Sequence, residues 1–215
     1  MIPLRDSRKK RRFAWVTAAL LAGNAAVFAW ELSLGEQAPA AIARLAVSPA
    51  EVVALAEPLS LPLRLVAALF LHGGWLHLLG NLAFLWVFGD DVESRLPPRR
   101  YLALYLLSGL VASAAQIAAT PRSTLPLIGA SGAIAGILGA FLVLFPRAKL
   151  SGVLPLGCLL VPMTSRAFLF IPFWFLLQLA GALLAAPGSQ SGGVAWYAHL
   201  AGFAAGPLLL FALRR

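Results

Sequence analysis

Six apolar segments of nearly transmembrane length dominate this sequence. They cover residues 13–30, 69–88, 101–119, 129–145, 167–186 and 194–213. A helix needs about 20 apolar residues to cross the hydrocarbon core of a bilayer. Only 12% of the residues are charged, whereas soluble domains carry about 25%. We therefore predict an all-α, polytopic membrane protein with six transmembrane helices, and exclude an ordinary cytosolic enzyme, a disordered chain and a secreted disulfide scaffold.

The cationic residues indicate how the chain is oriented. With six spans and a cytoplasmic N-terminus, 14 of the 17 Lys and Arg residues fall in cytoplasmic segments, and only Arg44, Arg64 and Arg122 lie outside. This asymmetry predicts that both termini are cytoplasmic. The net charge of +9 does not indicate nucleic-acid binding, because the charges separate apolar segments and do not form a patch on a soluble face. Residues 1–12 are expected to be a basic cytoplasmic segment, and 13–215 the membrane domain.

Three segments need separate interpretation. Residues 150–163 are apolar but short and contain Pro155 and Pro162, which favours an interfacial or re-entrant segment over a span. The external loop 31–68 contains a capping-box pattern at Ser48-Pro49-Ala50-Glu51, which predicts a short helix up to Ala56. That helix is expected on the outer membrane surface or, equally, in a plain solvated loop. The first apolar segment could also be a cleaved secretory signal, although an inside-start map with six spans already satisfies the charges.

Polar side chains inside predicted spans are the candidate functional residues, because burying them in a bilayer is costly. All three histidines, His72, His77 and His199, lie in or at the edge of such spans. His77 and Asn81 are four residues apart and share one helix face. Helical phase rotates His72 well away from that face. One such histidine could simply be bonded to a carbonyl, but this explanation is weaker for all three.

Ser131 stands at the start of the fourth apolar segment, within Gly129-Ala130-Ser131-Gly132. Glycine on either side permits close approach of a substrate or another backbone. The N-terminus of a helix also offers unpaired N–H groups to a developing anion. A serine there could instead bond only to a backbone carbonyl. On the six-span map, Ser131, His77, Asn81 and His199 all lie in the outer half of the membrane.

Small residues predict that the fourth and sixth spans pack closely. The fourth has Gly132 and Gly136 four residues apart, and the sixth has Ala198, Gly202 and Gly206 at the same spacing. Such spacing lets helices approach closely in lipid, with or without any chemistry. Ser131 and His199 adjoin these two small-residue faces.

The distribution of carboxylates restricts the chemistry. All eight acidic residues lie at or before Glu93, so no span interior offers the paired aspartates of an aspartyl protease. The glutamate of a His-Glu-x-x-His zinc site is also missing. Three histidines could formally bind zinc, but His72 and His77 are poorly phased on a helix. The remaining arrangement is a Ser131 nucleophile with His199 as general base. His77, Asn81 and the Ser131 N–H could stabilise an oxyanion.

These motifs together resemble the rhomboid family of intramembrane serine proteases, of the six-span bacterial type. The resemblance covers roughly residues 58–213. It rests on His72-x4-His77-x3-Asn81, on Gly129-Ala130-Ser131-Gly132, and on Ala198-His199-x2-Gly202-x3-Gly206. Gly89, Glu93, Phe145-Pro146-Arg147-Ala148 and Gly192-Gly193-Val194-Ala195-Trp196 add to it.

The resemblance implies a function and roles for individual residues. It implies that Ser131 is the nucleophile, that His199 is the general base, and that His77 and Asn81 line the oxyanion hole. It implies that His72 is a supporting residue near the water entrance, while Gly129, Gly132 and Gly202 support the site by close packing. It further implies that loop 31–68 packs sideways in the outer leaflet and that the fifth span gates substrate access.

The expected partners are transmembrane protein substrates and the lipid bilayer, with no nucleic acid, metal or other cofactor. A bacterial cytoplasmic membrane fits the family type, with the active site opening to the outer face. Two positions depart from the family pattern. Leu63 precedes Arg64 where tryptophan is frequent, and Ala135 stands where an aromatic ring often stacks on the catalytic histidine. The second departure predicts a looser His199 ring and lower activity.

Two alternatives to a protease remain. A rhomboid-like protein without activity would bind membrane clients, but that class has normally lost the serine or the histidine. A small transporter or channel would favour broken helices in paired repeats and ionisable groups along a full pathway. The sequence shows no internal repeat, and its polar groups cluster at one depth.

Overall fold

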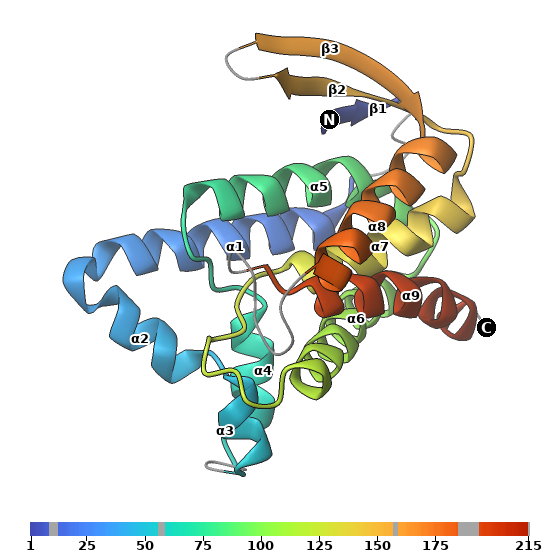
Figure 1. Cartoon of the computed structure of the whole chain (residues 1–215). Helices are drawn as coiled ribbons and strands as arrows, with labels where there is room; N and C mark the ends of the chain where they lie inside the picture. The colour runs from blue at the N-terminus through green and yellow to red at the C-terminus, as the bar shows by residue number, and fades with distance from the viewer. Residues whose placement is uncertain (9–12, 56–58, 157–158, 185–193, 215) are drawn as a thin grey trace.

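Six long helices make up most of the structure, a computed structural model that describes residues 1–8, 13–55, 59–156, 159–184 and 194–214. They are α1 (Trp15–Ser33), α5 (Trp75–Glu93), α6 (Pro98–Ala119), α7 (Ser131–Leu144), α8 (Ala167–Leu184) and α9 (Trp196–Leu213). Each overlaps one predicted apolar segment (Figure 1). Among the described residues, α1, α6, α8 and α9 are long and apolar enough to cross a membrane. The chain is thus a largely helical, polytopic membrane protein.

The other two long helices differ from these four. α7 has only 14 residues, which corresponds to a length of about 21 Å. α5 carries Asp90, Asp91 and Glu93 in its last turn. The prediction of six complete spans therefore stays a prediction.

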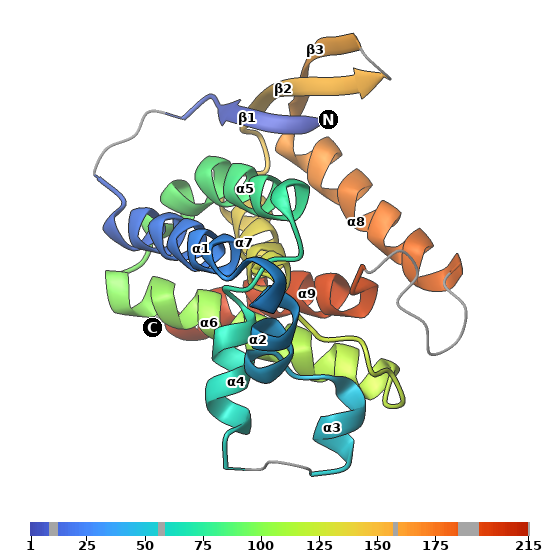
Figure 2. The same cartoon turned by 90° about the vertical axis from the view of Figure 1, so that its left-hand side faces the viewer.

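Helix α7 lies at the centre of the molecule, with α5, α6, α8 and α9 around it (Figure 2). Ten of its 14 residues are buried. A helix that is apolar on every side is stable only when other helices surround it. The sequence SGAIAGILGAFLVL has this character, so the nucleophile candidate Ser131 begins an element that its neighbours hold in place.

The interface between α7 and α9 depends on the predicted small residues. A Cβ atom added to Gly202 would overlap the carbonyl oxygen of Gly132, and one added to Gly206 would overlap that of Gly136. On the other side of α7, a Cβ atom on Gly136 would overlap the side chain of Ser108 in α6. The predicted close packing of the fourth and sixth apolar segments is therefore confirmed.

The segment that precedes α5 folds into short helices. They are the 3-10 helix η1 (Gly35–Gln37), α2 (Ala38–Leu45), α3 (Pro49–Val53) and α4 (Leu61–Ala68). The capping box at α3 is confirmed: the Ser48 side chain accepts from the Glu51 N–H, and Glu51 accepts from the Ser48 N–H at 2.9 Å. The helix ends at Val53, and the predicted end around Ala56 lies outside the described residues.

The side chains of Arg64 and Glu51 hold this segment together by hydrogen bonds. Arg64 in α4 donates to the carbonyl oxygen of Ala46 and, at 3.3 Å, to Glu51. The Ser48 N–H, the Ser48 hydroxyl and Arg64 together hold the pKa of the Glu51 carboxyl below its ordinary value, against a smaller opposing effect of burial.

Leu63, one of the two departures from the family pattern, is 77% exposed.

A carboxylate at the end of α5 joins it to the start of α1. Glu93 accepts hydrogen bonds from the N–H groups of Val16 and Thr17 and from the Thr17 hydroxyl, at 2.7–3.0 Å. These N–H groups belong to the first turn of α1, where no side chain of α1 itself provides a cap. Glu93 therefore fixes α1 and α5 as an antiparallel pair.

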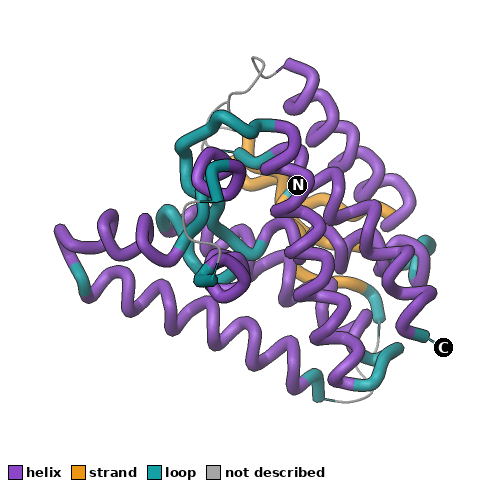
Figure 3. Tube along the Cα trace, turned by 90° about the horizontal axis from the view of Figure 1, so that it is seen from below, coloured by secondary structure: helices purple, strands orange, loops and turns teal. Residues whose placement is uncertain are grey.

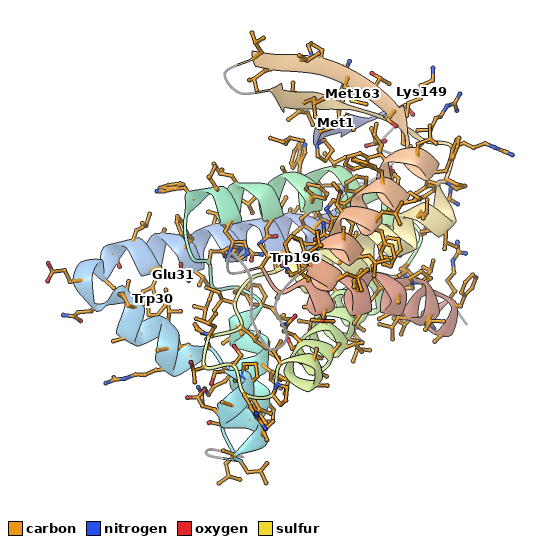
Figure 4. All side chains as sticks on the ribbon, viewed as in Figure 1. Met1, Trp30, Glu31, Lys149, Met163 and Trp196 are labelled. Atoms are coloured by element: carbon orange, nitrogen blue, oxygen red, sulfur yellow. The ribbon has the colours of Figure 1, made fainter. Side chains whose placement is uncertain are left out.

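A three-stranded antiparallel sheet shows that the all-α prediction is wrong in one region. Its strands are β1 (Ile2–Asp6), β2 (Lys149–Leu156) and β3 (Leu159–Arg166), in the order β1-β2-β3. β2 and β3 form a hairpin within the segment we expected to be interfacial or re-entrant. In Figure 4, the labels Lys149 and Met163 mark the sheet. In Figure 3, which views the molecule from below, the sheet lies behind the helices.

The two prolines of this segment explain the difference. Proline has no N–H group and disrupts a helix interior, but an edge strand tolerates it. Pro162 lies in the edge strand β3, opposite Val153. Pro155 lies on β2 beyond Val153, where pairing with β1 ends. The expected basic segment 1–12 includes β1, while Lys9 to Arg12 lie outside the described residues.

Candidate active site

Ser131 and His199 lie side by side although 68 positions separate them in the chain. His199 Nε2 is 2.8 Å from Ser131 Oγ. Ser131 is the first residue of α7, and His199 lies one turn into α9. The close α7–α9 interface brings these two helix starts together, so the small-residue pattern positions both side chains.

The loop before Ser131 is fixed by the segment that precedes α5. The Leu127 N–H donates to the Val47 carbonyl, and the Gly129 N–H donates to the Ala68 carbonyl, both at 2.8 Å. Gly129 has φ +110°, a backbone conformation that disfavours residues with a side chain. A Cβ atom there would also overlap the His77 ring. Gly129 thus allows the chain to turn into α7 directly beside His77.

His72, His77 and Asn81 form a second polar group of the same site. Asn81 Nδ2 is 3.0 Å from His72 Nε2, while His72 Nδ1 is 3.0 Å from the Phe70 carbonyl. A carbonyl only accepts, so His72 donates from Nδ1 and accepts from Asn81 at Nε2. The His72 and His77 ring centroids are 5.1 Å apart.

The contact between His72 and Asn81 corrects a sequence expectation. Helical phase placed His72 away from the face of His77 and Asn81, but α5 begins only at Trp75. His72 precedes the helix, so helical phase does not apply to it. The helical phase of His72 and His77 was also the objection to a three-histidine zinc site, and that objection no longer applies. Nevertheless, the described residues contain one geometric candidate for a metal, Asp6, Asp90 and Asp91, at the opposite end of α5.

A carboxylate also approaches the site, contrary to our expectation. We assigned Glu31 to the external loop, yet it lies in the last turn of α1 and is buried. The backbone N–H of His72 donates to Glu31 Oε1 at 3.0 Å. Figure 4 shows Glu31 beside Trp30 near the end of α1. Glu31 therefore holds the main chain at His72 and does not contact the Ser131–His199 pair.

Gln178 is a site residue that the sequence analysis missed. Its Oε1 atom is 2.8 Å from His199 Nδ1, so the histidine has a polar neighbour on both ring nitrogens. The signal was present in the sequence, since Gln178 is the one amide or ionisable side chain between Ala167 and Leu184. The usual partner of a catalytic histidine is an acidic residue, and this part of the chain contains none.

Two indole rings lie near His199, and the looser ring that Ala135 predicts stays a prediction. The Trp174 ring centroid is 6.0 Å from that of His199, with 37° between the planes. Trp196 contacts the histidine edge-on at 6.5 Å. Trp174 lies on α8 and not on α7. The aromatic contact that Ala135 cannot supply therefore comes from a different helix.

A cavity of about 680 Å³ is lined by Ser131 and Ala135 of α7 and by His199 of α9. Its lining also includes His77, Asn81 and Phe84 of α5, and Trp174 and Gln178 of α8. The cavity is mainly apolar with a few convergent polar groups, as is usual for a binding site. The arrangement provides a nucleophile beside a base, with an amide donor nearby, which suits acyl transfer.

Comparisons with known proteins agree with this geometry. The family model described as Rhomboid domain matches residues 61–215. The chain is 42% identical over 79 residues to Rhomboid protease GluP of Bacillus subtilis, covering 37% of this chain and 15% of that protein. It is 39% identical over 79 residues to RHOMBOID-like protein 5 of Arabidopsis thaliana, covering 37% of this chain and 26% of that protein.

A third relative matches over a longer segment. Rhomboid-like protease 5 of Toxoplasma gondii is 32% identical over 161 residues, which is 71% of this chain and 16% of that protein. The matched segments thus cover about a quarter or less of each of these three relatives. Because the family model matches well over half of the sequence, the chain belongs to the rhomboid family.

Proposed function

We propose that this protein is an intramembrane serine endopeptidase that cleaves transmembrane segments of other membrane proteins. The observation that carries the proposal is the 2.8 Å separation of Ser131 Oγ and His199 Nε2, both of which line a mainly apolar cavity. The family membership adds to it. No metal or other cofactor is needed for this chemistry.

The reaction proceeds by acyl transfer. Ser131 Oγ attacks the scissile carbonyl carbon while its proton passes to His199 Nε2. The resulting oxyanion is stabilised by Asn81, His77 and the Ser131 N–H. His199 then gives its proton to the leaving amine, the C–N bond breaks, and an acyl-enzyme remains. Water then attacks the acyl carbon while its proton passes to His199. The acyl C–Oγ bond breaks, His199 returns the proton to Ser131 Oγ, and the carboxylic acid product leaves.

The His72 contact suits this role for Asn81. One N–H of the Asn81 amide points to His72 Nε2, which leaves the second N–H for an oxyanion. His72 therefore holds the amide plane, as a supporting residue would.

The proposal includes six spans with both termini in the cytoplasm. The end of α5 adjoins the start of α1 through Glu93, and the start of α6 adjoins the end of α9 through Arg100 and Leu213. These ends carry most of the cationic residues, which the positive-inside rule assigns to the cytoplasm. Ser131 and His199 then open toward the outer face, and a bacterial cytoplasmic membrane is the proposed location.

Cleavage of a transmembrane reporter in proteoliposomes tests the function. Wild type is expected to cut the reporter within its transmembrane segment, with the site mapped by mass spectrometry, and Ser131→Ala to abolish cutting. Ser165→Ala, a serine in the β3 strand that does not line the cavity, is the matched control and should cleave normally. Equal cleavage by wild type and Ser131→Ala would contradict the proposal. Binding of the reporter without any cleavage would instead indicate an inactive client-binding protein.

A further inference from the structure

The side-chain amide of Gln178 has one orientation that satisfies both of its neighbours. Its Nε2 atom is 3.2 Å from the Trp174 carbonyl oxygen, and its Oε1 atom is 2.8 Å from His199 Nδ1. A carbonyl oxygen only accepts, so the NH2 group must face Trp174. The amide oxygen therefore faces the histidine, and it too can only accept.

This orientation determines where the His199 proton lies. Because Gln178 Oε1 accepts, Nδ1 of a neutral His199 must carry the hydrogen. Nε2 then presents its lone pair to the Ser131 hydroxyl, 2.8 Å away. In the opposite tautomer, Nε2 would present a hydrogen to Ser131 and could not act as a base.

We propose that Gln178 is a positioning residue that fixes the tautomer and the ring plane of His199 for proton transfer from Ser131. The inference rests on the proposed function and assigns the third member of its catalytic group. The group is spread over three helices, with the nucleophile on α7, the base on α9 and the positioning amide on α8.

The burial of Gln178 supports this role. The residue is 8% exposed and lies in a helix whose other side chains are apolar or aromatic. An amide without partners is costly in such surroundings. The neighbouring residues Phe173, Leu176 and Leu177 are 50–59% exposed on the outer side of α8. Gln178 and Trp174, four residues apart, share the face that turns toward the cavity.

A neutral amide also fits the location better than a carboxylate. An ionised acid beside His199 would have to be desolvated within the membrane. The amide accepts the same Nδ1 hydrogen without burying a charge, although it stabilises a protonated imidazole less strongly than an anion does. This explains how the base can be held in a part of the chain that contains no acidic residue.

Two substitutions separate positioning from packing. Gln178→Met keeps the length of the side chain and removes the acceptor, while Gln178→Glu keeps an acceptor for Nδ1. Leu177→Met, on the outer side of the same helix turn, is the matched control. We expect Gln178→Met to lower kcat about 10- to 100-fold with KM within about twofold, because ring orientation affects the chemical step and not binding. Gln178→Glu should recover most of kcat, and Leu177→Met should match wild type.

The tautomer can be observed without any turnover. The chain has three histidines, so ¹⁵N-histidine NMR with His199→Ala for assignment resolves the His199 ring. Wild type should show a protonated Nδ1 and an unprotonated Nε2, and Gln178→Met a mixture of tautomers. Thermal unfolding verifies that each variant folds. If Gln178→Met melts early, Gln178→Asn, whose amide is one methylene too short, should give the same loss of kcat and the same mixture.

The outcomes distinguish this inference from the proposed function. Gln178→Met could cleave in a Ser131-dependent way with wild-type kcat and show the wild-type tautomer. That result would overturn the positioning role of Gln178 and leave the proposed protease function intact. Failure of Gln178→Glu to recover kcat would also count against it. Cleavage that does not depend on Ser131 would overturn the protease, while the NMR result would still report the Gln178–His199 bond.

Discussion

The two sides of helix α9 pack in contrasting ways. Toward α7, glycine faces backbone, and Gly202 and Gly206 leave no space for even one additional carbon atom. Toward α8, the contacts are made by large rings, among them Trp174 with Phe203 at 6.3 Å and Phe175 with Phe203 at 4.9 Å. Backbone-to-backbone packing leaves a helix little freedom to shift, whereas rings can turn about their side-chain bonds as the helix moves. The site therefore combines one rigid side with one adjustable side.

The contrast assigns a different task to each side. The α7–α9 interface sets the separation of Ser131 and His199. The α8 side supplies the groups that orient the His199 ring, namely the Gln178 amide and the Trp174 indole. Movement of α8 would thus disturb the orientation of the His199 ring before it disturbed the distance from that ring to Ser131.

The strongest way to break the contrast is to add bulk on the rigid side. Gly206→Leu places a side chain where Gly136 backbone lies. We expect it to lower the free energy of unfolding by about 3 kcal/mol or more, equivalent to a Tm lowered by about 10 °C, and to abolish cleavage. Ala204→Leu, on the exposed side of the same helix, is the control and should retain both. Thermal unfolding in detergent measures the difference, and equal Tm values for the two variants would contradict it.

An intermediate effect is expected on the adjustable side. Trp174→Leu removes the ring beside His199 but keeps the main-chain carbonyl that orients Gln178. The loss of one ring contact predicts a three- to tenfold fall in kcat, about 0.5–1.5 kcal/mol, with little change in Tm. Phe173→Leu, at the exposed neighbouring position, should behave as wild type in the same reporter assay. A large fall in the Tm of Trp174→Leu would mean that α8 packs against α9 as rigidly as α7 does.

The smallest effect is expected at the α3 capping box, which belongs to neither side of α9. A substitution there gives a baseline for the effects on the two sides. The pKa of Glu51 is lowered in the folded protein, so its contribution to stability is present above the unfolded value of about 4.5 and is lost as pH falls through the lower folded value. Glu51→Gln should lower Tm by roughly 1–2 °C at pH 7 and by less at pH 3, with cleavage unchanged. Glu36→Gln, an exposed acid nearby, is the control. The same Tm difference at both pH values would contradict the role of the Glu51 charge.

The helical part of the fold could be predicted because its signals are local. Apolar length locates the helices, small residues every fourth position locate the α7–α9 contact, and the Ser48 to Glu51 pattern locates a cap. The sheet could not be predicted, since β1 pairs with the distant strand β2. Even Ser7, just after β1, contacts Lys149 across 142 positions of the chain. An apolar stretch with two prolines does not itself specify strand pairing.

The site was predictable to the extent that its residues follow helical spacing. Such patterns identified four residues that line one cavity in the structure, namely Ser131, His199, His77 and Asn81. His72 was assigned a wrong direction because the start of α5 at Trp75 cannot be located from hydropathy alone. Gln178 was overlooked because its importance depends on the packing of α8 against α9, which no spacing within α8 reveals. The same holds for Trp174, whose ring lies beside His199 on a different helix from Ala135.

The pairing of β1 with β2 also has a consequence for the order in which the protein is assembled. At roughly 5–20 residues per second, a ribosome takes roughly 7–30 s to make the chain between Ser7 and Lys149. During that time α1, α5, α6 and α7 are synthesised while β1 has no partner strand. Closure of the sheet therefore follows the synthesis of α7, and it joins β1 to a segment made only after the helix that begins at Ser131.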